Sequence, residues 1–221
     1  MAIEQTGTAE PVDRRRRRRQ ESLEEILRIA VDVMAEDGVA ALSLSEVARR
    51  MGIRPPSIYK YFPSRLAVYD ALFGRTSEHL RDLFREEAAA AEPGLPALSA
   101  GFVALGRYMM DNPVLAQLVN WRPVPGFEPS AEAFAPNREY VDEIRAVVAT
   151  AVELGQLHPA AAEEEGLAVL SILASGAMTQ QLANEPDATF ETGRFTSLLP
   201  GLLALFQRAY QPAAHPTGGR S

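Results

Sequence analysis

Apolar residues recur along most of the chain at the spacing of an amphipathic helix. The first such helix is predicted to begin near Ser22, where an S-x-x-E pattern can cap it, and to end at Gly38. Its apolar residues, spaced three or four positions apart, are Leu23, Ile26, Leu27, Ala30, Val33 and Met34. The sequence shows neither the alternating pattern of a strand nor an internal repeat. This pattern predicts an all-α fold.

Two short helices are predicted close together on either side of a glycine. Ser43 opens an S-x-x-E pattern, in which the serine side chain caps the first turn of a helix. Gly52 ends that helix, and Pro55 suits the first turn of the next, where no backbone N–H is needed. The two helices, expected at 44–51 and 55–62, have the length and connection of a helix-turn-helix.

The rest of the chain reads as further helices separated by proline and glycine breaks, which gives about nine helices in all. They are expected at 65–91, 96–110, 114–121, 137–154, 159–184 and 191–210. The stretch 122–136 contains four prolines and a glycine, and it is predicted to form a long loop. Ser64 can cap the fourth helix, and Pro200 is expected to kink or divide the last one.

Four segments follow from these patterns. Residues 1–19 lack apolar periodicity and are expected to form a disordered basic arm, and residues 212–221 a disordered tail. Residues 20–65 are expected to form a helix-turn-helix domain that binds DNA. Residues 66–211 are expected to form a separate helical domain.

The charge of the chain is unevenly distributed. The net charge is −7, yet residues 14–65 hold 12 Lys and Arg against 7 Asp and Glu, a net of +5, whereas residues 66–221 carry a net of −9. Such asymmetry indicates that one part of the chain meets a polyanion. The arginine run at 14–19 is expected to contact phosphate or a minor groove in a salt-sensitive manner, although a purely solvated tail has the same composition.

Several classes of protein are disfavoured. The chain has no cysteine, its three histidines are far apart in sequence, and no P-loop, dinucleotide-binding, nucleophile-elbow or H-x-x-x-H motif occurs. Glu163–Glu165 is interpreted as a solvated helix start, so neither a metal nor a cofactor is expected. No apolar run reaches the roughly 18 residues of a membrane span, and polar residues follow the arginine run where an export signal needs apolar ones. We therefore expect a cytoplasmic protein without a membrane partner.

The third predicted helix exposes an unusual set of side chains. With Ile58 and Phe62 facing inward, the outer surface carries Pro55, Pro56, Ser57, Tyr59, Lys60 and Tyr61. Hydroxyls and a lysine can bind phosphates or base edges, and prolines can contact thymine methyl groups. This surface is typical of a helix that enters the major groove.

At this point the sequence resembles the tetracycline-repressor (TetR/AcrR-like) family of transcription regulators. The resemblance rests on Ile26-Leu27-x-x-Ala30, on Gly38, and on the run LSLSEVARRMGIRPPSIYKYFPSRLAVYDAL at 42–72. It implies that Ser43 and Ser45 meet phosphate or a base edge. The full set of DNA contacts that we expect is Ser43, Ser45, Arg54, Pro55, Pro56, Ser57, Tyr59, Lys60, Tyr61 and Arg65.

Three of these positions depart from the family pattern. Tyr61 stands where histidine is common, Arg65 where lysine is common, and Pro55 where a polar base reader is frequent. The resemblance therefore does not extend to the operator sequence.

For the C-terminal domain, the resemblance implies a ligand cavity and a dimer interface. The candidate cavity residues are Phe102, Met109, Met110, Trp121, Phe134 and Tyr140, each of which also suits an ordinary core. The eighth and ninth helices are expected to form a homodimer through small residues on one and leucines on the other. The expected dimer residues are Ala168, Ser171, Ala174, Ser175, Gly176, Ala177, Leu198, Leu199, Leu202, Leu203 and Phe206.

The function predicted from the sequence is that of a ligand-responsive, DNA-binding transcription regulator. We expect a repressor that leaves a palindromic, double-stranded operator when a small apolar ligand binds. Two alternatives stay open: a regulator of the same fold without a small-molecule ligand, and a helical enzyme.

Overall fold

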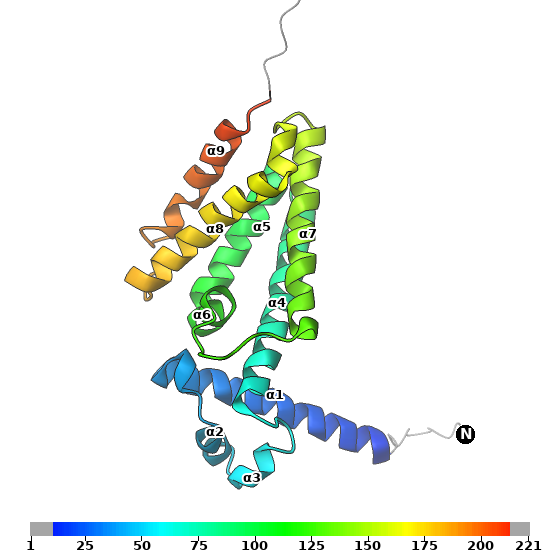
Figure 1. Ribbon diagram of the computed structural model, residues 1–221, viewed down its shortest axis with the longest axis vertical. Helices are drawn as coiled ribbons and strands as arrows, with labels where there is room; N and C mark the ends of the chain where they lie inside the picture. Colours follow the sequence, from blue (N-terminus) through cyan, green and yellow to red (C-terminus); the bar gives the residue numbers. More distant parts are fainter. Residues whose placement is uncertain (1–10, 213–221) are drawn as a thin grey trace, which may run out of the picture. The chain divides into compact units, whose positions relative to one another are not determined.

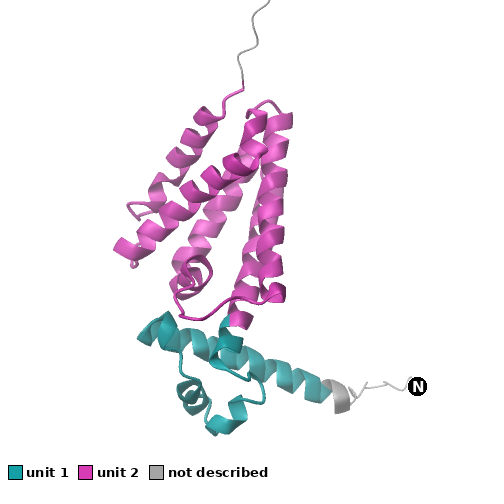
Figure 2. Ribbon diagram, in the orientation of Figure 1, with its two compact units in different colours: residues 1–69 teal, residues 70–221 magenta. Residues whose placement is uncertain are grey.

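The computed structural model describes residues 11–212, with only the backbone described for 11–13. All regular elements among these residues are helical, as the sequence pattern predicts (Figure 1). Contacts divide the chain into two compact units, residues 1–69 and residues 70–221 (Figure 2). The boundary falls inside one helix, α4 (Arg65–Ala90), which contributes residues to both units.

Unit 1 is built from three α-helices, one short 3-10 helix and the start of α4. Its elements are α1 (Pro11–Asp37), η1 (Val39–Ala41), α2 (Leu44–Arg50) and α3 (Pro55–Ile58). The predicted apolar face of α1 is confirmed, since Ile26, Ala30 and Val33 are fully buried. They pack with Val47 and Ala48 of α2 into the core of this unit.

Helix α1 begins much earlier than expected. The prediction of disorder up to residue 19 is wrong for the described residues from Pro11 onward, and residues 1–10 and 213–221 lie outside the described part of the chain. Ser22 is an interior residue whose hydroxyl donates to the carbonyl of Arg18 (3.0 Å) and does not cap the helix. Proline suits a helix start, and the pair Arg17–Glu21 (3.0 Å) supports an exposed turn. A helical extension without an apolar face leaves no periodicity to detect.

Unit 2 is a bundle of longer helices. Its elements after α4 are α5 (Leu95–Asp111), α6 (Pro113–Trp121), α7 (Ala131–Glu153), η2 (Pro159–Ala162), α8 (Glu164–Asn184), η3 (Thr196–Leu198) and α9 (Leu199–Ala209). Helix α5 packs against both α7 and α8, and α9 lies along α8 (Figure 1). Phe84, Leu98 and Phe206 are among its fully buried side chains.

Three predicted boundaries in unit 2 are corrected. Helix α7 starts at Ala131 and carries Pro136 inside it, so the predicted loop 122–136 is shorter. The reason is a cap that precedes the proline: Ser130 Oγ accepts the Ala133 N–H (3.1 Å). The predicted helix 159–184 is divided into η2 and α8. The predicted helix 191–210 begins only at Thr196, as η3 followed by α9, and Pro200 lies in the first turn of α9.

Helix α8 is the one described helix that is long and apolar enough to cross a membrane, judged by length and composition alone. In the structure, however, Leu170, Met178 and Leu182 of this helix are buried within unit 2. A helix that is apolar on most sides is expected in the core of a bundle.

Candidate nucleic-acid interface and ligand cavity

The cap of α2 and the glycine turn that leads into α3 form as the sequence predicts. Ser43 Oγ accepts the Glu46 N–H (3.3 Å), and this bond caps α2. Gly52 has a φ of 68°, a left-handed conformation that other residues rarely adopt. Past it, the Ile53 N–H donates to the carbonyl of Ala48 (3.0 Å) and closes the helix end. The chain is thereby turned into α3.

Helix α3 is short, and it is fixed by two buried side chains. Ile58 is fully buried and Phe62 is 7% exposed, so the predicted inward face is confirmed. The regular helix ends at Ile58, where the sequence predicted an end at Phe62. The chain continues in turns, with Tyr61 N–H donating to the carbonyl of Ile58 (2.9 Å). Pro63 accounts for an end at Phe62, because the residue before a proline is disfavoured in helical conformation, but it does not account for the earlier end at Ile58.

Most of the predicted DNA contacts lie on the outside of unit 1. Tyr59 is 53% exposed, which is high for a tyrosine. Exposed residues of the predicted set are Ser43, Ser45, Arg54, Pro55, Pro56, Tyr59, Lys60 and Arg65, and partly buried ones are Ser57 and Tyr61. Eight of the ten predicted contacts are thus accessible to another molecule.

The positive charges of this surface differ in what surrounds them. Glu46 accepts hydrogen bonds from Arg49 (2.7 Å) and Arg50 (2.8 Å), and these bonds lower the pKa of its carboxyl to about 2. Arg50 also binds Glu36 on α1 (2.7 Å), and the Arg50 hydrogen bond lowers the pKa of Glu36. The two arginines of α2 are therefore largely neutralised within unit 1.

Around α3, the cations have no such acidic neighbour. Within residues 11–212, neither Arg54 nor Lys60 forms an ion pair. Arg65 donates one hydrogen bond to the carbonyl of Ala40 (3.4 Å) and forms no ion pair with a described residue. The unbalanced positive charge therefore gathers at the start and end of α3 and at the start of α4.

Arg19, the last residue of the arginine run on α1, reaches the same surface. Arg19 donates to the carbonyl of Lys60 (3.4 Å), and its guanidinium lies 5.5 Å from the centre of the Tyr61 ring. Tyr61 is therefore held against α1, which explains its partial burial. The hydroxyl of Tyr69 donates to the carbonyl of Val39, and burial raises the pKa of this hydroxyl. Both contacts tie separate segments of unit 1 together.

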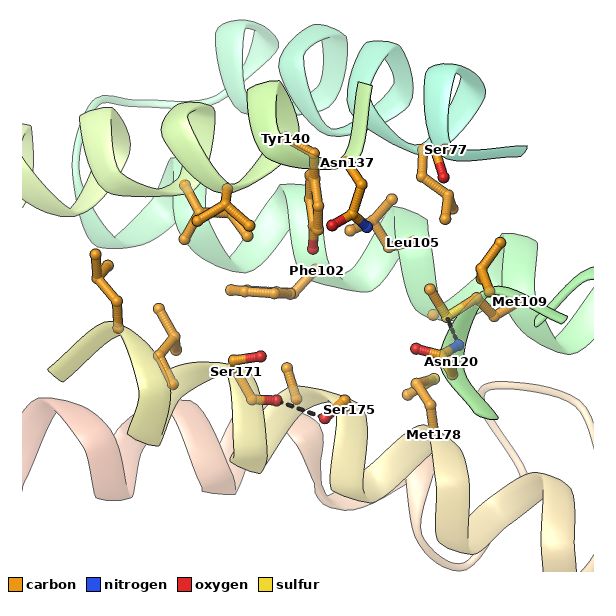
Figure 3. Close-up of a pocket in the computed structure, with 18 of the residues that line it drawn as sticks. Ser77, Phe102, Leu105, Met109, Asn120, Asn137, Tyr140, Ser171, Ser175 and Met178 are labelled. Carbon is orange, nitrogen blue, oxygen red and sulfur yellow. Dashed lines mark hydrogen bonds between the residues drawn. The ribbon is translucent and has the colours of Figure 1, made fainter. Parts of the chain in front are cut away.

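A cavity of about 220 Å³ lies inside unit 2, among α4, α5, α6, α7, α8 and α9 (Figure 3). Its walls are mostly apolar. The lining residues are Ser77, Leu80, Phe102, Leu105, Gly106, Met109, Val119, Asn120, Asn137, Tyr140, Val141, Ile144, Leu167, Leu170, Ser171, Ala174, Ser175, Met178 and Leu199.

The polar groups of the cavity fall into two sets. Asn120 donates to the carbonyl of Ala116 (2.9 Å), and Ser175 to the carbonyl of Ser171 (2.7 Å). Ser77, by contrast, is 2% exposed, and its hydroxyl has no hydrogen-bond partner within residues 11–212. Burial raises the pKa of the Tyr140 hydroxyl, which faces the interior (Figure 3). Tyr140 is therefore a neutral hydrogen-bond donor.

Three of the six predicted cavity residues line this space and three do not. Phe102, Met109 and Tyr140 line it. Met110 is buried in the core beside it.

The other two lie elsewhere in unit 2. Trp121 is 36% exposed and donates its indole N–H to Thr179 Oγ1 (3.2 Å). Phe134 stacks on Phe73, with ring centres 6.0 Å apart, and the Arg122 guanidinium lies 5.4 Å from the Phe134 ring. An aromatic cluster thus takes Phe134 away from the cavity.

Sequence reasoning missed the contributions of α4 and α8. Ser77 lies on the buried stripe of α4 that runs through Phe73, Leu80 and Phe84 at helical spacing. A serine in such a stripe is a signal that the sequence already contains. Met178 and Ala174 of α8 also line the space, on a helix that the sequence assigns to the dimer interface alone.

The expected dimer residues are divided between the inside and the outside of unit 2. Leu199 and Phe206 are each 1% exposed and belong to the core of the chain itself. Large apolar side chains are nevertheless open on or beside the same two helices: Ile172 is 69% exposed, Leu198 55% and Leu205 49%. Within the described residues, no three His, Asp or Glu side chains gather as a metal site would require.

Comparison with known proteins shows which family profile and which solved structures this chain resembles. Residues 26–72 match the sequence profile described as "Bacterial regulatory proteins, tetR family". A protein of unknown function from Rhodococcus sp. RHA1 is similar in structure, with a TM-score of 0.69, 21% identity, and coverage of 86% of this chain and 94% of that one.

Two further solved structures share the fold. The TetR family transcriptional regulator PfmR from Thermus thermophilus has a TM-score of 0.66 at 20% identity, over 83% of this chain and 97% of that one. The regulator FadR from Bacillus subtilis, solved in complex with stearoyl-CoA, has a TM-score of 0.66 at 15% identity. The match covers 83% of this chain and 96% of that one. At these identities the likeness shows that both units share the fold of such proteins.

Proposed function

We propose that the chain, whose residues 26–72 match the tetR family of bacterial regulatory proteins, is a repressor that leaves a palindromic operator when a small apolar ligand binds. The operator is bound by unit 1, and the ligand occupies the cavity of unit 2. A bacterial regulator of this kind acts in the cytoplasm, where the DNA lies.

The observation that carries the DNA-binding part is the contrast between α2 and α3. The arginines of α2 are paired with Glu46 and Glu36, whereas Arg54 and Lys60 around α3 have no ion pair within the described residues. Phosphates supply the missing negative charge, and binding them releases counterions from the DNA. Tyr59, exposed between these cations, offers a hydroxyl to a phosphate.

A homodimer through α8 and α9 completes the proposal. Twofold symmetry would place two copies of α3 about one turn of DNA apart, roughly 34–36 Å, and a palindromic site would match them. The exposed Ile172, Leu198 and Leu205 supply apolar area for this contact. A monomer would read only half of such a site.

Ligand control follows from the cavity. A ligand that binds one conformer of the dimer better than the other shifts the population toward that conformer and weakens operator binding. Helix α4 supports this coupling, since it gives Arg65 to the DNA-binding surface and Ser77 to the cavity. The ligand-bound FadR relative supports ligand binding by this fold. The cavity is the observation that favours the ligand-responsive alternative over a regulator without a ligand.

The first test selects DNA from a random duplex pool and then measures binding by fluorescence anisotropy at two salt concentrations. We expect a palindromic sequence bound by a dimer. Lys60→Ala should weaken binding evenly across sequences and lower the salt dependence by about one counterion. Tyr59→Phe, which removes only the hydroxyl, should weaken binding roughly three- to tenfold. Arg145→Ala, an exposed arginine on α7 in unit 2, serves as the charge-matched control.

Recovery of a palindrome, weakened by Lys60→Ala and unaffected by Arg145→Ala, would support operator binding through α3. Equal losses for the two variants would mean that the charge of the whole chain, and not this surface, determines the affinity. Binding without sequence preference would contradict the proposed operator.

A further inference from the structure

We propose that the cavity of unit 2 selects an uncharged molecule, slightly larger than a benzene ring, whose hydroxyl or carbonyl oxygen is bound by Ser77 together with Asn137. The inference rests on the proposed function in one respect, since it describes the ligand of the same cavity. It adds the charge, the size and the polar group of that ligand.

The residues that line the cavity indicate that the ligand is uncharged. None of the residues that line the cavity is ionised at neutral pH, and most are aliphatic or aromatic. A carboxylate, phosphate or ammonium group placed there would lose its hydration without gaining a counter-charge, and burial of an unpaired charge is strongly unfavourable. The cavity therefore disfavours acids and amines in their ionised forms.

The size follows from the volume. An engineered cavity of about 150 Å³ with apolar walls binds benzene in another protein. The present cavity, at about 220 Å³, has room for one ring with a short substituent. A molecule much larger than this would either displace side chains such as Phe102 or Leu105 or extend out of this volume.

The polar group follows from Ser77. A serine inside a helix ordinarily bonds to a carbonyl one turn earlier, as Ser175 does. The Ser77 hydroxyl has no partner within the described residues although it is almost fully buried, and an unsatisfied buried hydroxyl is destabilising. A ligand oxygen that bonds to it removes this cost.

Asn137 and Tyr140 extend the same polar edge. Neither side chain makes a hydrogen bond to another described residue, and both lie on the α4 and α7 side of the cavity with Ser77 (Figure 3). The opposite side carries Ser171 and Ser175 on α8, and the Ser175 hydroxyl is already bonded within the helix (Figure 3). The oxygen of the ligand therefore points toward α4 and α7, and its apolar body toward α5 and α8.

The test is calorimetric titration of the full chain with three probes that share an ethylbenzene framework: 4-ethylphenol, ethylbenzene and 4-ethylbenzoate at about pH 7, where only the benzoate is charged. We expect 4-ethylphenol to bind most tightly, ethylbenzene more weakly, and the anion roughly tenfold or more below the phenol. Ser77→Ala should reduce the affinity for 4-ethylphenol roughly three- to thirtyfold and change that for ethylbenzene less than about threefold. Ser175→Ala is the matched control, because its hydroxyl lines the same cavity but is bonded to the Ser171 carbonyl.

Thermal denaturation of the variants without ligand checks that they are folded. Removing an unpartnered hydroxyl should leave the melting temperature of Ser77→Ala unchanged or raised. Benzoate binding as tight as that of the phenol, equal losses for both neutral probes in Ser77→Ala, or no binding of any probe would each overturn the proposal. Anisotropy with the selected operator separates this from the proposed function: Ser77-dependent binding without DNA release would uphold the ligand class and contradict ligand control.

Discussion

Glu46 is the residue on which the charge balance of unit 1 depends. It accepts hydrogen bonds from Arg49 and Arg50, and Arg50 in turn binds Glu36 on α1. These bonds join α1 to α2 and remove two arginines from the charge available to DNA. The same bonds make the stability of unit 1 depend on pH.

The expected pH dependence has a definite sign. The pKa of Glu46 is about 2 in the folded chain, because Arg49 and Arg50 donate to it, against about 4.3 in an unfolded chain. Its contribution to stability is therefore complete above about pH 4.3 and is lost as the pH falls toward about 2. Glu46→Gln should lower the urea midpoint of unfolding at about pH 6, and the difference from the native chain should shrink by about pH 3.

Urea unfolding at about pH 6, 4 and 3 measures this difference across the titration of the carboxyl. Glu86→Gln on α4 is the control, since Glu86 is an exposed glutamate outside unit 1 that forms no ion pair with a described residue. A difference that stays constant with pH would show that the two arginine bonds contribute nothing through the charge of Glu46.

The residues of the DNA-binding surface can be predicted from the sequence more completely than those of the cavity. The expected DNA contacts all fall between Ser43 and Arg65, where caps, a glycine and two prolines fix the local backbone. The cavity draws on six successive helices, with lining residues spread from Ser77 to Leu199, and packing determines which of their side chains meet. Phe134 illustrates the difference: its spacing suits the cavity, but Phe73 and Arg122 hold it elsewhere.

Among the elements, α7 shows how a helix start is fixed by a distant residue. Ser130 caps the helix with its hydroxyl oxygen, while the same hydroxyl and the Ser130 N–H donate to the carboxylate of Asp70 on α4 (2.8 and 2.7 Å). This pair of hydrogen bonds to another helix lies before Pro136, and it lets α7 begin at Ala131, well ahead of the start that its apolar pattern predicts.

Ser130→Ala removes the cap and one bond to Asp70. We expect a loss of about 1 kcal/mol in the free energy of unfolding, and a melting temperature lower by roughly 2–4 °C for a chain of this size. Ser99→Ala on α5 is the matched control, since Ser99 lies inside a helix and makes no hydrogen bond to a described residue. Calorimetric scans of both variants measure the effect, and equal melting temperatures would contradict the role of the cap.

The existence of the helices was predicted better than their ends. Every predicted helix has a counterpart among the described residues, because each buries an apolar stripe that the sequence displays. The start of α1 at Pro11 and of α7 at Ala131 was missed, since exposed turns and a cap held by Asp70 leave no apolar period. Pro200, expected to kink or divide the last helix, lies where that helix is divided.

For the whole molecule, the exposed apolar area bears on its association. Ile172 on α8 and Leu205 on α9 are open to solvent on two helices that pack together. Apolar side chains as exposed as these are a weak signal alone, but several on adjacent helices are typical of an interface. The proposed palindromic operator requires such a dimer.

Ile172→Glu should convert the protein to a monomer, because it places a charge in the apolar contact, and should lower its affinity for the full operator more than for a half-site. Sedimentation velocity measures the association, and anisotropy measures the binding. Leu154→Glu is the matched control, since Leu154 is 54% exposed at the end of α7, away from both helices in sequence. If Ile172→Glu stays dimeric, or if Leu154→Glu dissociates instead, the contact does not involve α8 as proposed.

Trp121 has an optical consequence. It is the only tryptophan of the chain, it lies at the end of α6, and its indole N–H is bound to Thr179 of α8, close in sequence to the cavity residues Val119 and Asn120. Excitation at the red edge of protein absorption, where tryptophan absorbs and tyrosine does not, therefore gives fluorescence from unit 2 alone. The emission colour reports how well α6 and α8 shield one indole from water, so occupancy of the cavity can be followed in the native protein without a label. A chain without cysteine also accepts a single engineered thiol on α3, which makes the DNA-binding surface separately addressable with a second dye.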